Sequence, residues 1–197
     1  MAMNSYCSNI RKDTQSYIYG QGKSLFEETT SASYKRDSLR LAISIAAPLI
    51  AGAVGAIFTS ESVSTWYQTL EKPSFSPPNW LFGPVWTALY VLMGISLFLV
   101  WRATSTFPGN RRSRKIAAFI AFGTQLILNV LWSFLFFGLR SPQLAFAEIV
   151  ILLISIAVTI VIFFKISKLA AILMMPYAGW VTFASFLNLQ IWLLNSS

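Results

Sequence analysis

The alternation of apolar and polar segments divides the chain into a polar beginning and five long apolar stretches. These stretches cover roughly residues 39–59, 79–101, 116–138, 143–164 and 169–194. Each is close to the ~20 residues that an α-helix needs to cross a bilayer. None shows the period-two alternation of a membrane β-strand, so a β-barrel is excluded. The pattern predicts an all-α integral membrane protein, a bundle of five transmembrane helices.

The segments between the stretches restrict how the helices connect. The connections at residues 139–142 and 165–168 are so short that the helices they join must run antiparallel. The connection at residues 60–78 contains Pro73, Pro77 and Pro78 and cannot be one continuous helix. Residues 1–38 are polar and lack the apolar core of a secretory signal. We therefore expect a disordered or weakly helical extension at residues 1–38, followed by a transmembrane domain at residues 39–197.

Composition and charge agree with a membrane location. Hydrophobic residues make up 55% of the chain and charged residues only 11%, whereas soluble domains carry about 25% charged residues. In so apolar a chain, the excess of 15 Lys and Arg over 7 Asp and Glu indicates membrane topology rather than nucleic-acid binding. Five spans place every Lys and Arg except Lys72 and Arg140 on the side of the N-terminus. The positive-inside rule then predicts a cytosolic N-terminus.

Two residue types that often carry chemistry are scarce. The chain has no histidine, which excludes Ser-His-Asp and Cys-His catalysis and removes the commonest metal and haem ligand. Cys7 is the only cysteine, so no intrachain disulfide can form. No phosphate-binding loop or cluster of metal ligands occurs. We therefore predict no metal site and no required cofactor.

Aromatic and amide side chains recur at helical spacing in three of the stretches. Each set falls on one helix face: Trp86, Tyr90, Met93 and Leu97 in the second stretch, Gln125, Asn129, Trp132 and Phe136 in the third, and Tyr177, Trp180, Ala184 and Leu187, with Asn188 beside them, in the fifth. The three faces favour a shared cavity, although ordinary packing explains Trp86, Trp132 and Trp180 equally well. Tryptophans nearer the ends of the stretches are typical interface anchors.

Two further features leave alternatives open. Glu148 is the only acidic residue within an apolar stretch, and an intramembrane carboxylate suggests a functional polar site. A structural bond near the interface, to Arg140 or to an amide of the third stretch, is the alternative. Ala47, Ala51 and Gly55 recur every four residues and predict close helix packing in the first stretch, with a homodimer contact as the alternative.

Several of these residues together resemble the signature of the TspO/MBR family. The resemblance rests on WYQTLEKPSFSPP at residues 66–78, GPVW at 83–86, LN at 128–129, and PY at 176–177 with Trp180. It covers about residues 40–192. It implies a five-helix bundle, often dimeric, whose ligand cavity opens under the long first connection. It also implies lipophilic ligands: tetrapyrroles such as porphyrin or haem, sterols such as cholesterol in animal members, and benzodiazepine-type drugs.

The resemblance also assigns ligand-binding residues. Together with the helical stripes, it gives Tyr67, Trp86, Tyr90, Asn129, Trp132, Ala147, Trp180, Ala184 and Leu187. The favoured function is therefore that of a receptor or carrier for tetrapyrroles or related lipophiles, with no catalytic residue. Trp86 and Trp180 match the tryptophans implicated in light-dependent porphyrin breakdown by some bacterial members, so such an enzyme is one alternative.

A sterol-binding protein or scaffold is the other alternative. It is weakened because the Tyr and the basic residue of the animal cholesterol-recognition pattern are missing after Leu187 and Asn188. Partner proteins of such a scaffold would dock on the basic loop at residues 111–115. The polar extension resembles plant-type members and suggests the mitochondrial outer membrane or the ER and Golgi membranes. The expected partners are the lipid bilayer, a lipophilic small molecule and a second copy of the chain, but no nucleic acid.

Overall fold

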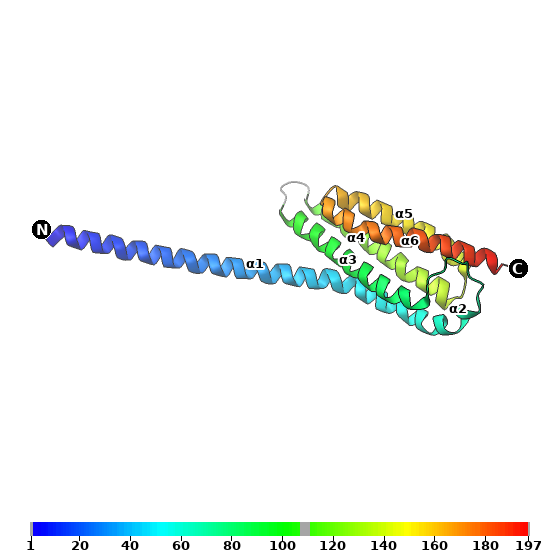
Figure 1. The fold of residues 1–197 in the computed structure, drawn as a ribbon. Coiled ribbons are helices and arrows are strands. Elements are labelled where there is room, and N and C mark those ends of the chain that lie inside the picture. The colour runs from blue at the N-terminus through cyan, green and yellow to red at the C-terminus, as the bar shows by residue number, and fades with distance from the viewer. Residues whose placement is uncertain (1, 107–110, 197) are drawn as a thin grey trace. The chain divides into compact units, whose positions relative to one another are not determined.

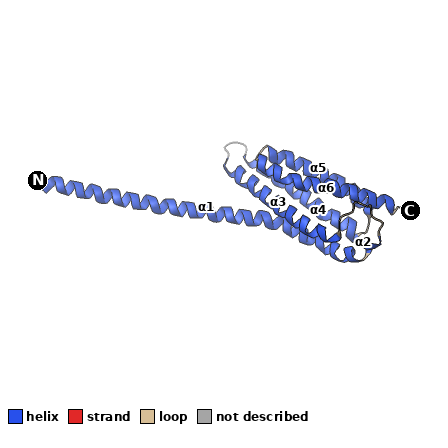
Figure 2. Cartoon of the chain, in the orientation of Figure 1, coloured by secondary structure: helices blue, strands red, loops and turns tan. Residues whose placement is uncertain are grey.

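All the regular secondary structure in the described part of the chain is helical. The computed structural model describes the backbone of residues 2–106 and 111–196, and these residues contain no strand (Figures 1 and 2). The elements are α1 (Ala2–Ser64), α2 (Trp66–Thr69), α3 (Asn79–Thr106), α4 (Arg111–Ser133), the π-helix η1 (Phe134–Gly138), α5 (Pro142–Phe164) and α6 (Lys168–Leu194). Two compact units result, Met1–Arg40 and Leu41–Ser197. In the described part of the first unit, where a disordered or weakly helical extension was expected, the backbone is helical.

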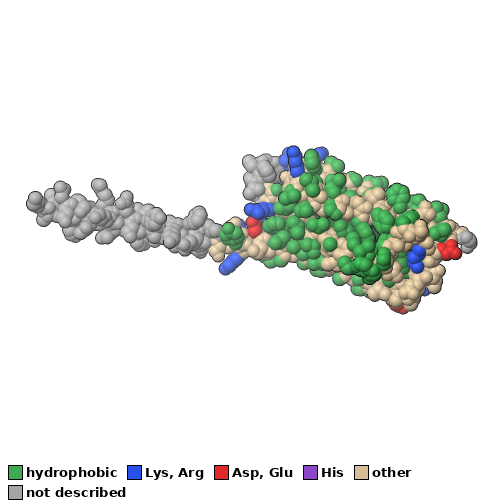
Figure 3. All heavy atoms as spheres, viewed as in Figure 1, with side chains coloured by type: hydrophobic (Ala, Val, Ile, Leu, Met, Phe, Trp, Pro, Cys, Tyr) green, Lys and Arg blue, Asp and Glu red, His purple; other side chains and the backbone are tan. Residues whose placement is uncertain are grey.

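Five helical segments of the described chain are long and apolar enough to cross a membrane. They are Ser33–Ser64, Asn79–Ala103, Ser113–Gly138, Pro142–Phe164 and Lys168–Leu194. The prediction of an all-α protein with five transmembrane helices is confirmed. The first segment extends past its predicted end, because α1 remains helical through Ser64. Figure 3 shows mostly apolar side chains over the bundle surface, as expected of a surface that faces lipid.

Helices α3 to α6 pack side by side around an apolar core. Helix α5 lies against α4 and α6, and α3 lies against α4 and α6 (Figure 1). Fully buried core side chains come from α3, α5 and α6: Met93, Ile156, Met174 and Tyr177. The short turns begin the next helix with a serine N-cap: Ser141 accepts from the Leu144 amide and Ser167 from the Ala170 amide.

Close approach of α1 to α3 depends on glycine. A Cβ at Gly94 of α3 would lie 2.6 Å from the Cα of Ile45 and 2.8 Å from the carbonyl oxygen of Ser44. Gly52 of α1 faces the ring of Tyr90, which a Cβ at this position would overlap. Gly52 in the first stretch and Gly94 in the second therefore let two helices of one chain approach closely.

The connection between α1 and α3 crosses the end of the bundle and is fastened to the end of α6. The amide of Glu71 donates to Oδ1 of Asn195 at 3.0 Å, and Nδ2 of Asn195 donates back to the Glu71 carbonyl at 3.0 Å. Asn195 is the C-cap of α6. Because Asn195 ends a helix of the bundle, its two hydrogen bonds with Glu71 fix the connection relative to the bundle.

Candidate ligand-binding cavity

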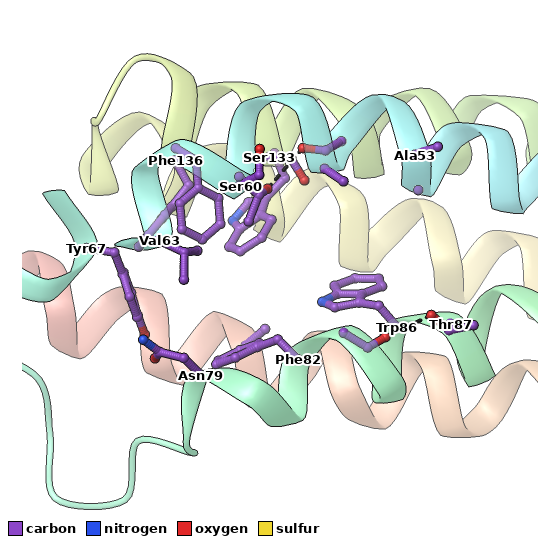
Figure 4. A pocket seen from close by; sticks show the side chains of 18 of the residues that line it. Ala53, Ser60, Val63, Tyr67, Asn79, Phe82, Trp86, Thr87, Ser133 and Phe136 are labelled. Atoms are coloured by element: carbon purple, nitrogen blue, oxygen red, sulfur yellow. Dashed lines mark hydrogen bonds between the residues drawn. The ribbon is translucent and has the colours of Figure 1, made fainter. Parts of the chain in front are cut away.

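A cavity of about 410 Å³ lies within the unit Leu41–Ser197, between α1, α2, α3, η1 and α6, with the end of α4. Its lining comes from α1 (Leu49, Gly52, Ala53, Gly55, Ala56, Thr59, Ser60, Val63), α2 (Tyr67), α3 (Asn79, Phe82, Gly83, Trp86, Thr87, Tyr90), α4 and η1 (Trp132, Ser133, Phe136, Phe137) and α6 (Ala184, Leu187, Asn188, Ile191). Figure 4 shows the indole of Trp86 projecting into this space, with Tyr67 and Asn79 together at one end. The volume falls within the range of small-molecule sites, about 300–1,000 Å³.

The lining is aromatic and aliphatic with a few neutral polar groups. No Lys, Arg, Asp or Glu occurs among the described lining residues. The polar groups are the hydroxyls of Thr59, Ser60, Thr87 and Ser133, the Tyr hydroxyls, the indole N–H groups of Trp86 and Trp132, and the amides of Asn79 and Asn188. An unpaired charge inside such a space would cost several kcal/mol, so the interior of the cavity suits the uncharged, lipophilic part of a ligand.

Stacked ring pairs form two of the walls. Trp86 stacks on Tyr90 with centroids 5.5 Å apart and an interplanar angle of 29°. Trp132 stacks on Phe136 at 5.3 Å and 27°. Tyr67 lies against Phe136 at 6.2 Å. These broad ring faces suit a ligand that is itself flat and conjugated.

The π-helix η1 contributes Phe136 and Phe137 to the lining. Its wider turn closes with the amide of Leu139 donating to the carbonyl of Phe134 at 2.8 Å. The hydroxyl of Ser62 in α1 donates to the carbonyl of Phe137 at 2.8 Å, which ties the end of α1 to η1. Single π-turns within α-helices often mark functional sites, and here the π-turn adjoins the cavity.

A second layer of hydrogen bonds holds the rings in place. The Tyr90 hydroxyl donates to Oδ1 of Asn129 at 2.7 Å, and Nδ2 of Asn129 donates to the Tyr177 hydroxyl at 3.2 Å. Nε1 of Trp132 donates to Oδ1 of Asn188 at 3.1 Å, and Nδ2 of Asn188 donates to the Pro142 carbonyl at 2.8 Å. Both amides thus fix aromatic side chains of the cavity.

Tyr67 closes the cavity just outside the membrane spans. It is almost fully buried, and burial raises the pKa of its hydroxyl. A phenol is protonated at neutral pH even at its ordinary pKa of about 10, so the Tyr67 hydroxyl is a hydrogen-bond donor there.

Comparison with known proteins shows to which family the chain belongs. The sequence model of the TspO/MBR family matches residues 44–193. The chain belongs to the TspO/MBR family. The matched region contains every helix segment that lines the cavity. Together with the five apolar helices, it makes the chain a multi-pass integral membrane protein.

Curated TspO/MBR relatives cover most of the chain. The Tryptophan-rich protein TspO of Archaeoglobus fulgidus is 48% identical over 158 residues, which are 80% of this chain and 98% of that protein. The Tryptophan-rich protein TspO of Chlorobaculum tepidum is 42% identical over 157 residues, 80% and 96% of the two chains. The human Translocator protein is 35% identical over 146 residues, 74% and 84% of the two chains.

The TspO/MBR cavity contains most of the ligand-binding residues expected from the sequence. Six of them line it: Tyr67, Trp86, Tyr90, Trp132, Ala184 and Leu187. Asn129 is buried behind Tyr90, to which it is hydrogen-bonded. Trp180 lies behind a lining residue, its ring 5.9 Å from that of Phe82.

The structure does not bring Ala147 into the cavity. Helix α5 turns a stripe of buried residues toward the bundle, which includes Ala145, Glu148, Ile149 and Leu152. Ala147 falls outside this stripe and is exposed. Because α5 supplies none of the described lining residues, a position on its outer face has no route to the cavity.

The sequence pattern did not indicate that α1 lines the cavity. Eight lining residues come from this helix, among them Gly52, Gly55 and Ser60. The recurrence of small residues in the first apolar stretch is compatible with a cavity wall, but the same recurrence is typical of close helix packing. A small side chain serves both purposes, because it permits a close approach at one height and leaves empty space at another.

Glu148 is buried, with only 5% of its surface exposed. Neither of its carboxylate oxygens has a hydrogen-bond partner among the described residues, so no bond to Arg140 or to an amide of α4 is formed. It does not line the cavity. A role for Glu148 as an intramembrane polar site stays a prediction.

Proposed function

We propose that this TspO/MBR protein binds a flat lipophilic ligand, a tetrapyrrole such as protoporphyrin, in the cavity and serves as its carrier or receptor. The observation that carries the proposal is the stacked pair Trp86–Tyr90 on the wall of an uncharged cavity. A planar π-system gains about 0.5–1.5 kcal/mol from each aromatic pair, beyond the gain from buried area.

The rigidity of the walls supports a binding role. Trp132, Tyr90 and Asn188 are each held by a hydrogen bond to a neighbouring helix or turn. Such rings need little reordering when a ligand enters, which reduces the entropic cost of binding.

The position of Trp180 also favours binding over light-dependent breakdown. Of the two tryptophans that such an activity would use, Trp86 lines the cavity, whereas Trp180 lies behind Phe82. Only one of them could therefore touch a ligand that occupies the observed space. One bacterial relative has a name that denotes sensing, the Tryptophan-rich sensory protein of Cereibacter sphaeroides, which is 35% identical over 130 residues, 66% and 77% of the two chains.

Titration of protoporphyrin into the full chain in lipid nanodiscs, followed by the porphyrin's own absorption band, tests the proposal. We expect saturable binding that weakens at least about tenfold in Trp86→Ala, because the variant loses a stacking partner and its buried area. Trp80→Ala is the matched control, since Trp80 is 72% exposed and outside the lining.

Two further arms separate the alternatives. Equal affinities in Trp86→Ala and the wild type would remove the cavity from consideration as the binding site. Illumination of the complex distinguishes a carrier from a degrading enzyme: faster loss of the absorption band than in free porphyrin would show catalysis. Displacement of the porphyrin by cholesterol would favour a sterol ligand instead.

A further inference from the structure

One lysine lies beside the end of the uncharged cavity. Lys72, in the connection between α1 and α3, places its Nζ 4.8 Å from the ring centroid of Tyr67. Tyr67 is the lining residue at the end of the cavity where Asn79 also lies (Figure 4). Lys72 is half-buried and is not a lining residue. Its ammonium group is nevertheless close to the cavity, because it lies over the ring of a residue that lines it.

The position of Lys72 is fixed by the residue before it. The backbone of Glu71 makes two hydrogen bonds with the side chain of Asn195, each 3.0 Å long. Lys72 is therefore held at the end of the bundle, and only its side-chain torsions are free to move the ammonium group. The attraction between an ammonium and a ring face is weak where solvent has access, so a carboxylate can displace the ring.

The charge distribution leaves one place for an acidic group of the ligand. A carboxylate deep in the cavity would be desolvated without a cationic partner, because the described lining carries none. At the end near Tyr67, the connections to the neighbouring helices carry two cations, Lys72 and Arg140. Arg140 is exposed on the turn before α5, with a positive φ of 52°.

We propose that Lys72 pairs with a carboxylate on the edge of the ligand, so that the cavity selects flat lipophiles with an acidic edge over neutral ones. For tetrapyrroles, the macrocycle would lie among the rings while a propionate reaches the ammonium group. The inference rests on the proposed function, because it assigns the substrate class of the same cavity.

The experiment compares protoporphyrin with its dimethyl ester, which keeps the macrocycle and removes both negative charges. Binding of each compound to the full chain is measured in nanodiscs of neutral phosphatidylcholine, with empty nanodiscs subtracted. We expect the wild type to bind the acid about tenfold more tightly than the ester, as befits one charge-assisted hydrogen bond. In Lys72→Gln the ratio should fall to about one.

Two control variants test whether position or net charge is responsible. Lys72→Arg should keep the preference for the acid, because it keeps the cation in place. Arg140→Gln removes the same amount of charge from the same end and should also keep the preference.

The failures of the two proposals give different results. If the wild type binds acid and ester equally, or Lys72→Gln keeps the wild-type ratio, the role of Lys72 is wrong while the cavity remains a porphyrin site. If neither compound binds the wild type, the proposed function is wrong and the inference falls with it.

Discussion

At position 90, one side chain serves two parts of the molecule. The ring of Tyr90 forms a cavity wall with Trp86, and its hydroxyl donates to Asn129 at 2.7 Å. Asn129 in turn donates to Tyr177, so a single amide joins α3, α4 and α6. Removing the hydroxyl alone therefore separates the contribution of the network from that of the wall.

We expect Tyr90→Phe to lower the free energy of unfolding by about 0.6 and at most about 1.7 kcal/mol, the range for hydrogen bonds between membrane helices. The reason is that Asn129 loses a donor in an interior without water. Thermal unfolding in detergent, followed by circular dichroism, measures the effect, and Tyr34→Phe is the control because Tyr34 is 72% exposed. Equal stability of the two variants would show that the network does not hold the bundle together.

The role of Asn129 marks a limit of sequence reasoning at the residue scale. Helical spacing correctly placed Asn129 and Trp132 on the inner face of α4. It could not show that the larger side chain of Tyr90, from another helix, would stand between Asn129 and the cavity. Spacing within one helix tells which face is inward, but which inward residue borders an empty space depends on the neighbouring helices.

Among the described glycines, those at the contact between α1 and α3 leave the least room for a side chain. Gly94 faces backbone atoms of α1, which cannot turn aside as a side chain would. Gly123 of α4 has open space where its Cβ would be: apart from its chain neighbours and the backbone of its own helix, no atom lies within 4 Å. The two glycines therefore provide a matched pair within helices of similar apolar character.

We expect Gly94→Ala to destabilise the protein by about 1–3 kcal/mol, because the added methyl group forces α1 away from α3. Gly123→Ala should instead leave stability unchanged or raise it by about 0.5–1 kcal/mol through its better helix propensity. Unfolding temperatures of both variants, determined side by side, decide between these outcomes. A destabilised Gly123→Ala together with an unaffected Gly94→Ala would contradict the observed helix contact.

The apolar stretches predicted the spans well because the hydrocarbon thickness imposes both a minimum length and an apolar composition. They did not predict that α1 continues through Ser64 or that α4 ends in η1. Polar residues at a helix end look like a loop in sequence, and an α-turn and a π-turn have the same apolar composition. Contacts with other helices hold the end of α1, as in the hydrogen bond from Ser62 to Phe137, 75 positions further along the chain.

For the whole molecule, charge gives a prediction about orientation. Every Lys and Arg except Lys72 and Arg140 falls on one side of a five-span protein. We therefore propose that the N-terminus is cytosolic and that the cavity end near Tyr67 faces the opposite compartment.

A membrane-impermeant maleimide tests this orientation in spheroplasts of bacteria that express the chain. Cys7, the only cysteine, should react only after the membrane is opened. The variant with Cys7→Ser and Ser196→Cys should react in sealed spheroplasts, because an odd number of spans puts the two termini on opposite sides. The reverse labelling pattern would show that the charge distribution does not set the topology.

The two hydrogen bonds between Glu71 and Asn195 have a practical consequence for handling the protein. Asn195 stands two positions before the last residue of the sequence, yet it anchors a connection more than a hundred residues earlier. An affinity tag added after Ser197 leaves the amide in place, whereas trimming the terminus back to Leu194 would release the connection between α1 and α3, which carries Lys72. Shortened versions prepared for crystallisation should therefore retain their last residues.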